Sequence, residues 1–266
     1  MTLRSNWWSS KKSSGSLPRN PLATLFISDL HIDASRPAIT SQFIEFLQSD
    51  ARRADALYIL GDLFESWIGD DDPDSAQVTA IEGIRDLTAG GVPCFVMRGN
   101  RDFLLGERFA AASGAILLPD PLLLTLYGQS VLVMHGDALC TDDRSYQQLR
   151  ATVRDADWQR RFSALGVPQR RALAAAARDG SRAHTAAVGY SITDVNPGSV
   201  ADIVRNAETG ILLHGHTHRP AVHSFQVDER HCTRIVLGDW YSQGSVLRWD
   251  ERGYELLTLA RPGGPE

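Results

Sequence analysis

Short apolar runs alternate with polar segments along this chain, and five of them have the length and composition of a buried strand. These five runs cover residues 22–28, 54–60, 92–98, 130–134 and 210–213. Metal-ligating side chains follow the runs within a few residues, and they are Asp29, His31, Asp62, Asn100, His135, His216 and His218. Because the ends of strands in one sheet open onto a shared crevice, the pattern predicts a metal-dependent enzyme.

Helical periodicity fills the intervals between the first runs. It predicts helices over residues 37–50, 76–89 and 103–113, with glycines after the second and third as stop signals. This alternation of strands and helices implies βαβ units and a largely parallel sheet. Residues 233–240, 245–250 and 254–260 predict antiparallel strands that complete a second sheet. We therefore expect an α/β fold, in the form of a four-layer αββα sandwich.

The segment from Thr141 to Tyr190 differs from its surroundings, because it is helix-prone and rich in Ala and Arg. Its nine arginines and five aspartates give +4 within a chain of net charge −5. Mixed charge of this kind usually marks a solvated helical face. The segment lies between two of the ligand-bearing runs, however. We therefore expect it to form a helical cap that covers the metal edge and binds substrate. Residues 22–140 and 191–266 then form the core.

Composition narrows the range of possible functions further. A hydrophobic content of 43% is typical of a soluble globular protein, and the negative net charge argues against a general nucleic-acid binder. Lysine occurs only at positions 11 and 12, so phosphate contacts in the folded part fall to arginine. Three widely spaced cysteines favour a reducing compartment. Residues 1–21 lack the apolar region of a signal peptide, and we expect a disordered extension there.

The spacing of the candidate ligands favours two metal ions. Asp29 and His31 are two residues apart, as are His216 and His218, and side chains at that spacing on an extended backbone point the same way. The two oxygens of Asp62 can bridge two ions. Seven donors are too many for one ion with open positions, whereas two ions about 3.5–4 Å apart can share them. Nitrogen and oxygen donors without thiolate favour Mn²⁺, Fe²⁺ or Zn²⁺.

Five further residues near these ligands have open or structural interpretations. Arg101 follows Asn100 directly, where a guanidinium would stabilise the charge that develops on a phosphoryl group. The alternative interpretation of Arg101 is a surface ion pair with Asp102. His214 begins the His-rich segment, and we interpret it as a buried structural residue because seven donors already fill two sites. Asp70, Asp71 and Asp72 are interpreted equally well as support for the metal site or as soluble loop residues.

Taken in order, the motifs D-x-H, GD-x-F, GN-R-D, HGD and GHTH resemble those of calcineurin-like metallophosphoesterases. They extend from Asp29 to His218. Longer stretches, such as ALYILGDLFESWIGDD and RGNRDFLLG, are most similar to the branch of that family in lipid A biosynthesis. The resemblance implies hydrolysis of UDP-2,3-diacylglucosamine at its α-phosphorus by a hydroxide activated at a two-metal centre. The products would be UMP and 2,3-diacylglucosamine 1-phosphate.

The resemblance also implies roles for individual residues. One Mn²⁺ would be held by Asp29, His31, Asp62 and His218, and a second by Asp62, Asn100, His135 and His216. The catalytic residues would be Asn100, Arg101 and His135. Substrate contacts would come from Asn100, Arg101, Asp143, Ser181, His184 and His216. Where the family commonly carries a lysine three residues beyond His184, this chain has Ala187, so the resemblance does not supply that contact.

The resemblance places the enzyme on the cytoplasmic face of the inner membrane, as a peripheral protein without a nucleic-acid partner. The absence of an apolar run of about 18 residues agrees with a chain that does not span the membrane. A general phosphodiesterase or a diadenosine tetraphosphate hydrolase is the alternative among enzymes, and it would need no site for acyl chains. A metal-held scaffold without catalysis is disfavoured, because Asn100, Arg101 and His135 are all present.

Overall fold

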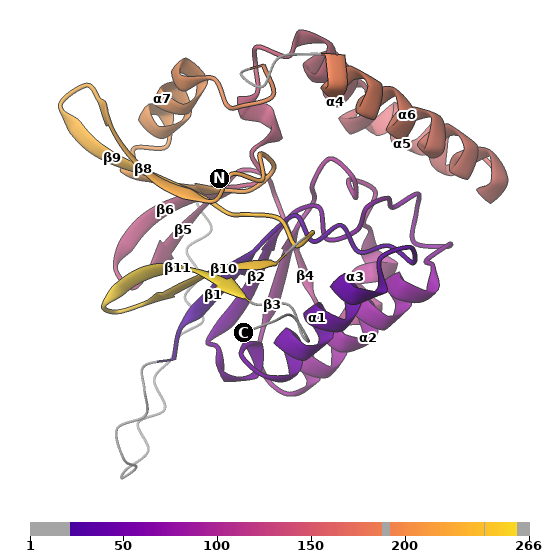
Figure 1. Cartoon of the computed structure of the whole chain (residues 1–266), viewed down its shortest axis with the longest axis horizontal. Helices are drawn as coiled ribbons and strands as arrows, with labels where there is room; N and C mark the ends of the chain where they lie inside the picture. The colour runs from indigo at the N-terminus through magenta and orange to yellow at the C-terminus, as the bar shows by residue number, and fades with distance from the viewer. Residues whose placement is uncertain (1–21, 188–191, 242, 260–266) are drawn as a thin grey trace.

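Two β-sheets packed face to face form the core of the computed structural model, which describes residues 22–187, 192–241 and 243–259 (Figure 1). The first sheet has the order β11 (Gly253–Leu259), β10 (Gly244–Asp250), β1 (Thr24–Ile27), β2 (Ala56–Leu60), β3 (Cys94–Met97), β4 (Ile116–Leu118). The second has the order β5 (Leu122–Leu126), β6 (Gln129–Met134), β7 (Ile211–His214), β9 (Arg230–Val236), β8 (Ala221–Val227). The strands β1 to β4 are parallel, as are β6, β7 and β9.

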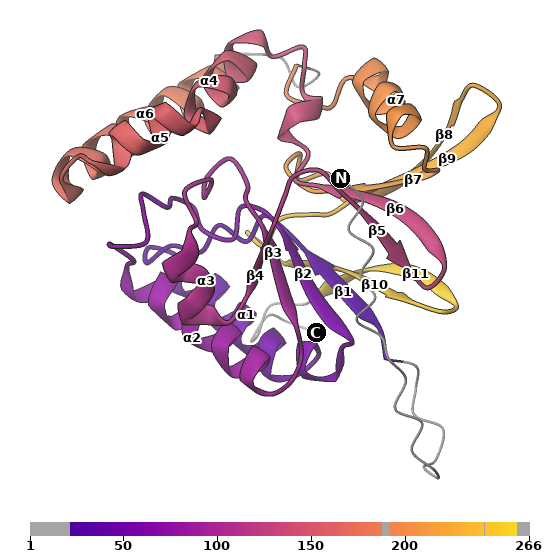
Figure 2. The same cartoon turned by 180° about the vertical axis from the view of Figure 1, so that it is seen from behind.

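Helices cover the outer faces of both sheets. The first sheet is covered by α1 (Pro37–Gln48), α2 (Ser75–Ala89) and α3 (Glu107–Ser113), and α7 (Pro197–Asn206) lies against the second (Figures 1 and 2). Short 3₁₀ turns, η1 (Ala51–Arg53) and η2 (Asp137–Leu139), follow α1 and β6. Three separate apolar clusters hold these layers together, and the middle one, with Leu60 and Trp249, fills the space between the sheets. The predicted four-layer αββα sandwich is thus confirmed.

The C-terminal strands depart from the prediction. Both β10 and β11 belong to the first sheet, where β10 lies antiparallel to β1 with Thr24 opposite Trp249. In the second sheet β9 is parallel to β7 and antiparallel to β8. Val246 and Leu247 of β10 face different apolar clusters, so this strand is buried on both sides. A local pattern reveals such burial, but the choice of neighbouring strand depends on packing across the whole chain.

The predicted helix over residues 103–113 begins four residues later, at Glu107. The carboxylate of Asp70 accepts hydrogen bonds from the backbone N–H groups of Gly106, Arg108 and Phe109, at 3.0, 3.0 and 3.1 Å. It thereby satisfies the free donors of the first turn of α3, as a capping side chain does. Asp70 is therefore a structural residue. The other two helices agree with prediction to within two residues at each end.

The helices of the insertion form an arm beside the core (Figures 1 and 2). They are α4 (Arg144–Arg154), α5 (Ala156–Ser163) and α6 (Val167–Ala187). On one side the ring of Trp158 lies 6.1 Å from that of Phe103 in the core. On the other, Arg170 and Arg171 of α6 pair with Asp71 and Asp72 of the loop after β2. Within the described ranges no helix is long and apolar enough to cross a membrane. The predicted extension over residues 1–21 lies outside those ranges.

Candidate metal centre

Loops at the carboxyl ends of five strands converge where the edges of the two sheets meet. Backbone hydrogen bonds continue past the strand ends and hold these loops in register. Asp29 N donates to Gly61 O at 3.1 Å, and His31 N donates to Asp62 O at 3.0 Å. In the second sheet Gly215 N donates to His135 O at 2.9 Å. The residues that follow β1, β2, β6 and β7 are therefore fixed beside one another.

The seven predicted ligands form a closed ring of contacts. In the first half of the ring, His218 Nε2 lies 3.4 Å from Asp29 Oδ1 and 3.2 Å from His31 Nε2, and His31 Nε2 lies 3.7 Å from Asp62 Oδ2. In the second half, His135 Nε2 lies 3.8 Å from Asp62 Oδ1, and Asn100 Oδ1 lies 2.9 Å from both His135 Nε2 and His216 Nδ1. The backbone N–H of His216 donates to Asp29 Oδ2 at 2.9 Å and closes the ring. The structure thus brings together every side chain that the sequence placed at a strand end. Their roles as ligands stay a prediction.

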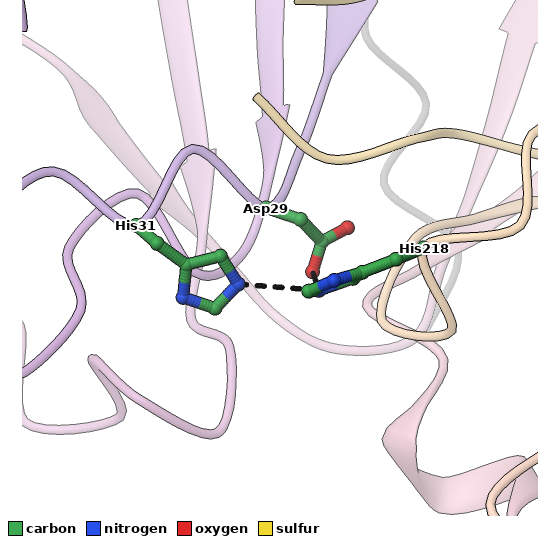
Figure 3. Close-up of side chains that lie close together, drawn as sticks. All are labelled: Asp29, His31 and His218. Carbon is green, nitrogen blue, oxygen red and sulfur yellow. Dashed lines mark hydrogen bonds and ion pairs between the residues drawn. The ribbon is translucent and has the colours of Figure 1, made fainter. Parts of the chain in front are cut away.

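The donor atoms of this ring fit a divalent cation. Nε2 of His31 and Nε2 of His218 face one another, and Asp29 lies beside them (Figure 3). Within the described part of the chain, Oδ1 of Asp29 is buried and accepts no hydrogen bond, although His218 Nε2 is 3.4 Å away. Donor atoms of Asp29, His31 and His218 lie within 4.8 Å of one another, as do those of Asp29, Asp62 and His135. Carboxylates and imidazoles are the ligands expected for a borderline metal.

Asp62 lies between His31 and His135. Its Oδ2 faces His31 and its Oδ1 faces His135. The backbone N–H of Arg101 donates to Oδ1 at 2.8 Å and fixes the orientation of the carboxylate. A carboxylate that directs one oxygen to each group of imidazoles has the geometry needed to serve two cations at once.

Backbone strain is concentrated in the same residues. Asp29, His31, Asp62, His216 and His218 have φ between 51° and 66°. They make up five of the eight non-glycine residues with positive φ in the ranges that the structure describes. Strained conformations of this kind persist where the surrounding structure enforces them, and they cluster at functional sites.

Two glycines permit the close approach of these loops. A Cβ on Gly99 would lie 2.1 Å from Asp62 Oδ1, and one on Gly61 would lie 2.5 Å from His135 Nδ1. Gly61 also has a φ of 93°, which side chains rarely adopt. The glycines of the GD and GN motifs are therefore required by the close approach of Gly99 to Asp62 and of Gly61 to His135.

The carboxylates in and beside the ring favour positive charge on His135. Burial lowers the pKa of His135, but the carboxylates of Asp62 and Asp137 outweigh it and raise that pKa to about 9. Nδ1 of His135 lies 2.9 Å from the carbonyl of Leu60 and can donate to it, so Nε2 is the atom that faces the ring. Burial and the neighbouring His135 lower the pKa of His216 to about 4. An environment that retains a proton on a buried imidazole favours any bound cation.

Arg101 has no ion pair with Asp102 among the described residues, so that alternative is wrong. Asp102 is fully buried and accepts hydrogen bonds from the N–H groups of Leu63, Phe64 and Gly99 at 2.8, 3.3 and 2.7 Å. Burial and the nearby Asp62 raise its pKa to about 6. It thus braces the loops after β2 and β3, and it forms no ion pair with the half-buried Arg101.

The remaining predicted residues lie on the insertion or beside the ligand motifs. Asp143 is buried, and its side chain caps α4 by accepting from Tyr146 N at 2.9 Å. Ser181 is half-buried on α6, and the side chains of His184 and Ala187 lie outside the described residues. His214 is buried beside the ring, with Nδ1 2.8 Å from Gly215 O. Burial lowers its pKa to about 3, which agrees with a neutral structural residue.

Three carboxylates in or near the motifs had no predicted role. Asp137 of the HGD motif is buried and accepts from Tyr146 Oη at 2.9 Å and from Arg150 Nε at 2.8 Å, which ties α4 to the end of β6. Glu65 lies 3.3 Å from His31, and Asp239 lies 3.5 Å from His218. Burial opposes ionisation of Glu65, but the nearby imidazole of His31 lowers its pKa to about 2. The signal in the sequence was their place beside a ligand motif, in GDLFE, HGD and LGDW.

Comparison with known proteins agrees with this geometry. Residues 22–220 match the calcineurin-like phosphoesterase family. The chain is 51% identical over 247 residues to a protein of Stenotrophomonas maltophilia (strain K279a), 50% over 246 residues to one of Xanthomonas oryzae pv. oryzae (strain PXO99A), and 49% over 238 residues to one of Enterobacter sp. (strain 638). Each similarity covers 90% of this chain and at least 99% of the relative. All three relatives are named UDP-2,3-diacylglucosamine hydrolase.

Proposed function

The chain belongs to the calcineurin-like phosphoesterase family, and from this premise we propose that it hydrolyses UDP-2,3-diacylglucosamine. Water adds to the α-phosphorus, and the bond from that phosphorus to the bridging oxygen breaks. UMP leaves with the new oxygen, and 2,3-diacylglucosamine 1-phosphate keeps the bridging one. Relatives of that name, with about half of their residues identical along nearly their full length, support the substrate. The observation that carries the chemistry is the closed ring of seven residues in which Asp62 lies between His31 and His135.

We propose that two Mn²⁺ ions occupy this ring. Asp29, His31, Asp62 and His218 would hold one, and Asp62, Asn100, His135 and His216 the other. A bound pair of such cations supplies hydroxide at neutral pH and neutralises phosphate charge. The buried, mixed nitrogen and oxygen donors and the buried Asp29 Oδ1 support this assignment.

The residues of the chain contribute orientation and charge. Asp62 is locked by the backbone N–H of Arg101, and the Leu60 carbonyl fixes the ring of His135. Arg101 follows Asn100 on the loop after β3, and we propose that its positive charge stabilises the extra negative charge of the transition state. Loop rigidity supports this role, because Trp67 N donates to Arg101 O at 3.0 Å and Asp102 braces the same turn.

The arm of α4, α5 and α6 is our proposed substrate cap. Its attachment to the metal centre through Asp137 and to the loop after β2 through Arg170 supports a position over the site. Asp143, Ser181 and His184 lie on the elements of this arm or at its start, and we propose that they contact the substrate as the family resemblance implies. A substrate with two acyl chains resides in a membrane, so we propose that the enzyme acts as a peripheral protein at the cytoplasmic face of the inner membrane.

A general phosphodiesterase activity is the alternative to be distinguished. Purified protein with Mn²⁺ should be offered UDP-2,3-diacylglucosamine, UDP-N-acetylglucosamine and bis(p-nitrophenyl) phosphate side by side. We expect the highest kcat/KM for the diacylated substrate, and loss of all activity after metal removal with a chelator. Equal or faster turnover of bis(p-nitrophenyl) phosphate would instead indicate a general phosphodiesterase.

A further inference from the structure

Two carboxylates outside the ring of donors lie directly behind two of its histidines. Oε2 of Glu65 is 3.3 Å from Nδ1 of His31, and Oδ2 of Asp239 is 3.5 Å from Nδ1 of His218. The opposite nitrogens of the same imidazoles, both Nε2, face each other at 3.2 Å inside the ring. Each histidine therefore lies between a carboxylate on its outer side and the proposed cation on its inner side.

Backbone contacts with the ligand loop hold both carboxylates in place. Glu65 N donates to Ile32 O at 3.1 Å, one residue beyond His31, and Ile32 also forms a short parallel bridge with Phe64. Beside Asp239, the N–H of Trp240 lies 3.3 Å from Asp29 O and donates to it. Glu65 is only 6% exposed, so its charge is poorly screened by water. The backbone at or next to each carboxylate is therefore tied to a ligand loop, with Glu65 buried and Asp239 half-buried.

An aromatic side chain packs against both of these imidazoles. The ring of Tyr241 stacks on His31 at 5.2 Å between centroids and meets the edge of His218 at 5.7 Å. Arg36 lies 4.6 Å over the same ring, with a guanidinium nitrogen 3.4 Å from Glu65 Oε2. This arrangement restricts rotation of both imidazoles, and Arg36 offsets part of the buried negative charge.

The other half of the ring is built differently. Nδ1 of His135 faces the backbone carbonyl of Leu60 at 2.9 Å, a neutral acceptor. His216 directs Nδ1, not Nε2, toward Asn100. Carboxylates behind metal-ligating histidines fix the tautomer and raise the basicity of the nitrogen that faces the metal, and a neutral carbonyl does so less strongly.

We propose that Glu65 and Asp239 are positioning residues that hold His31 and His218 as Nδ1–H tautomers and strengthen the cation site formed by Asp29, His31, Asp62 and His218. This inference rests on the proposed two-ion centre. It makes the two sites unequal, because a carboxylate faces Nδ1 of both His31 and His218, whereas Nδ1 of His135 faces a carbonyl oxygen and Nδ1 of His216 faces the amide of Asn100. The site backed by Glu65 and Asp239 should fill first as Mn²⁺ is added.

Calorimetric titration of the metal-stripped full chain with Mn²⁺ tests this. In Glu65→Ala and in Asp239→Ala, we expect one of the two dissociation constants to rise about 10- to 100-fold while the other stays at the parent value. Glu65→Gln should recover only part of the lost affinity, because an amide oxygen in the same position can accept from His31 Nδ1–H but lacks the charge that raises the basicity of Nε2. Asp239→Asn should behave likewise.

Asp70→Asn is the matched control, since it removes a carboxylate that holds backbone and touches none of the four histidines of the ring in the described structure. It should lower the melting temperature and leave both dissociation constants unchanged. At saturating Mn²⁺ the kcat of Glu65→Gln should approach that of the parent, with only the half-saturating Mn²⁺ concentration raised.

The outcomes separate this inference from the function on which it rests. A parent chain that binds fewer than two Mn²⁺ ions overturns the two-ion centre itself. The positioning role alone is overturned if the parent binds two ions and all four variants, Glu65→Gln, Asp239→Asn and the two alanine variants, bind Mn²⁺ as tightly as the parent does. Equal weakening of both sites in every variant, as in a general loss of structure, overturns it as well.

Discussion

The Nε2 atoms of His31 and His218 lie 3.2 Å apart, although 187 positions separate the two residues in the chain. His31 follows β1 in the first sheet, and His218 follows β7 in the second. The proposed metal centre therefore exists only when the two sheets are packed together. Sheet packing and metal binding should consequently be coupled, because a cation that binds the folded chain alone stabilises it.

The first prediction concerns Asp62. Asp62→Ala should abolish turnover and deplete metal at both positions, because this carboxylate is the one that faces both His31 and His135. His218→Ala should deplete mainly one ion, since its contacts are confined to the half of the ring with Asp29 and His31. Elemental analysis after gel filtration gives Mn²⁺ per chain. Two full equivalents in the Asp62→Ala variant would be incompatible with a shared ligand.

Arg101 gives the second prediction. Arg101→Ala should lower kcat by about 10²–10³-fold and raise KM less, because its charge is proposed to act on the transition state. The backbone N–H that binds Asp62 is retained in the variant, so metal content should not change. Steady-state kinetics with the diacylated substrate separates the two constants. A rise in KM alone would identify Arg101 as a residue that only binds the ground state.

The third prediction compares two glycines. Gly99→Ala should lower activity by about 10²-fold or more, because a Cβ 2.1 Å from Asp62 Oδ1 must displace that carboxylate. Gly180→Ala is the control, because a Cβ there meets no atom within 4 Å on α6. It should stabilise the chain by about 0.5–1 kcal/mol, the usual gain of alanine over glycine in a helix. Parent-like activity and metal content in Gly99→Ala would show that the loops adjust more easily than the packing implies.

The fourth prediction separates two adjacent arginines of α6. Arg170 is buried, donates to Ile68 O at 2.6 Å and pairs with Asp71, whereas Arg171 is exposed and pairs with Asp72. Arg170→Ala should loosen the arm and lower kcat/KM for the diacylated substrate about tenfold, the effect of about 1.4 kcal/mol of lost docking free energy.

Arg171→Ala should remain close to the parent, because exposed ion pairs contribute little. Hydrolysis of bis(p-nitrophenyl) phosphate should be nearly unchanged in both variants, since the ring of donors lies outside the arm. Loss of both activities to the same extent in Arg170→Ala would show that Arg170 supports the core and not substrate recognition.

The sequence located the metal centre because its residues follow buried strands. Asp29, Asp62 and His135 each come directly after, or within a residue or two of, an apolar run, and the carboxyl ends of those runs meet in the fold. The alternation of strands and helices likewise predicted the four layers. These features depend on local periodicity and on the rule that parallel strands share an edge.

Features set by long-range packing escaped prediction. The first sheet takes β10 beside β1, and no local pattern records that choice of neighbour. The start of α3 depends on Asp70, which lies 37 residues before it in the chain. Glu65 and Asp239 acquire a role only through their distance from His31 and His218, which the motifs alone do not reveal. The assignment of individual ligands and substrate contacts stays a prediction.

Hydrolysis in ¹⁸O-labelled water tests the central claim most directly. The full chain with Mn²⁺ and UDP-2,3-diacylglucosamine should release UMP that carries one solvent oxygen, while 2,3-diacylglucosamine 1-phosphate remains unlabelled by mass spectrometry. This result requires the proposed substrate, attack by water and the α-phosphorus as the point of attack. Label in the lipid phosphate would reverse the orientation of the pyrophosphate, and the absence of UMP would contradict the proposed function.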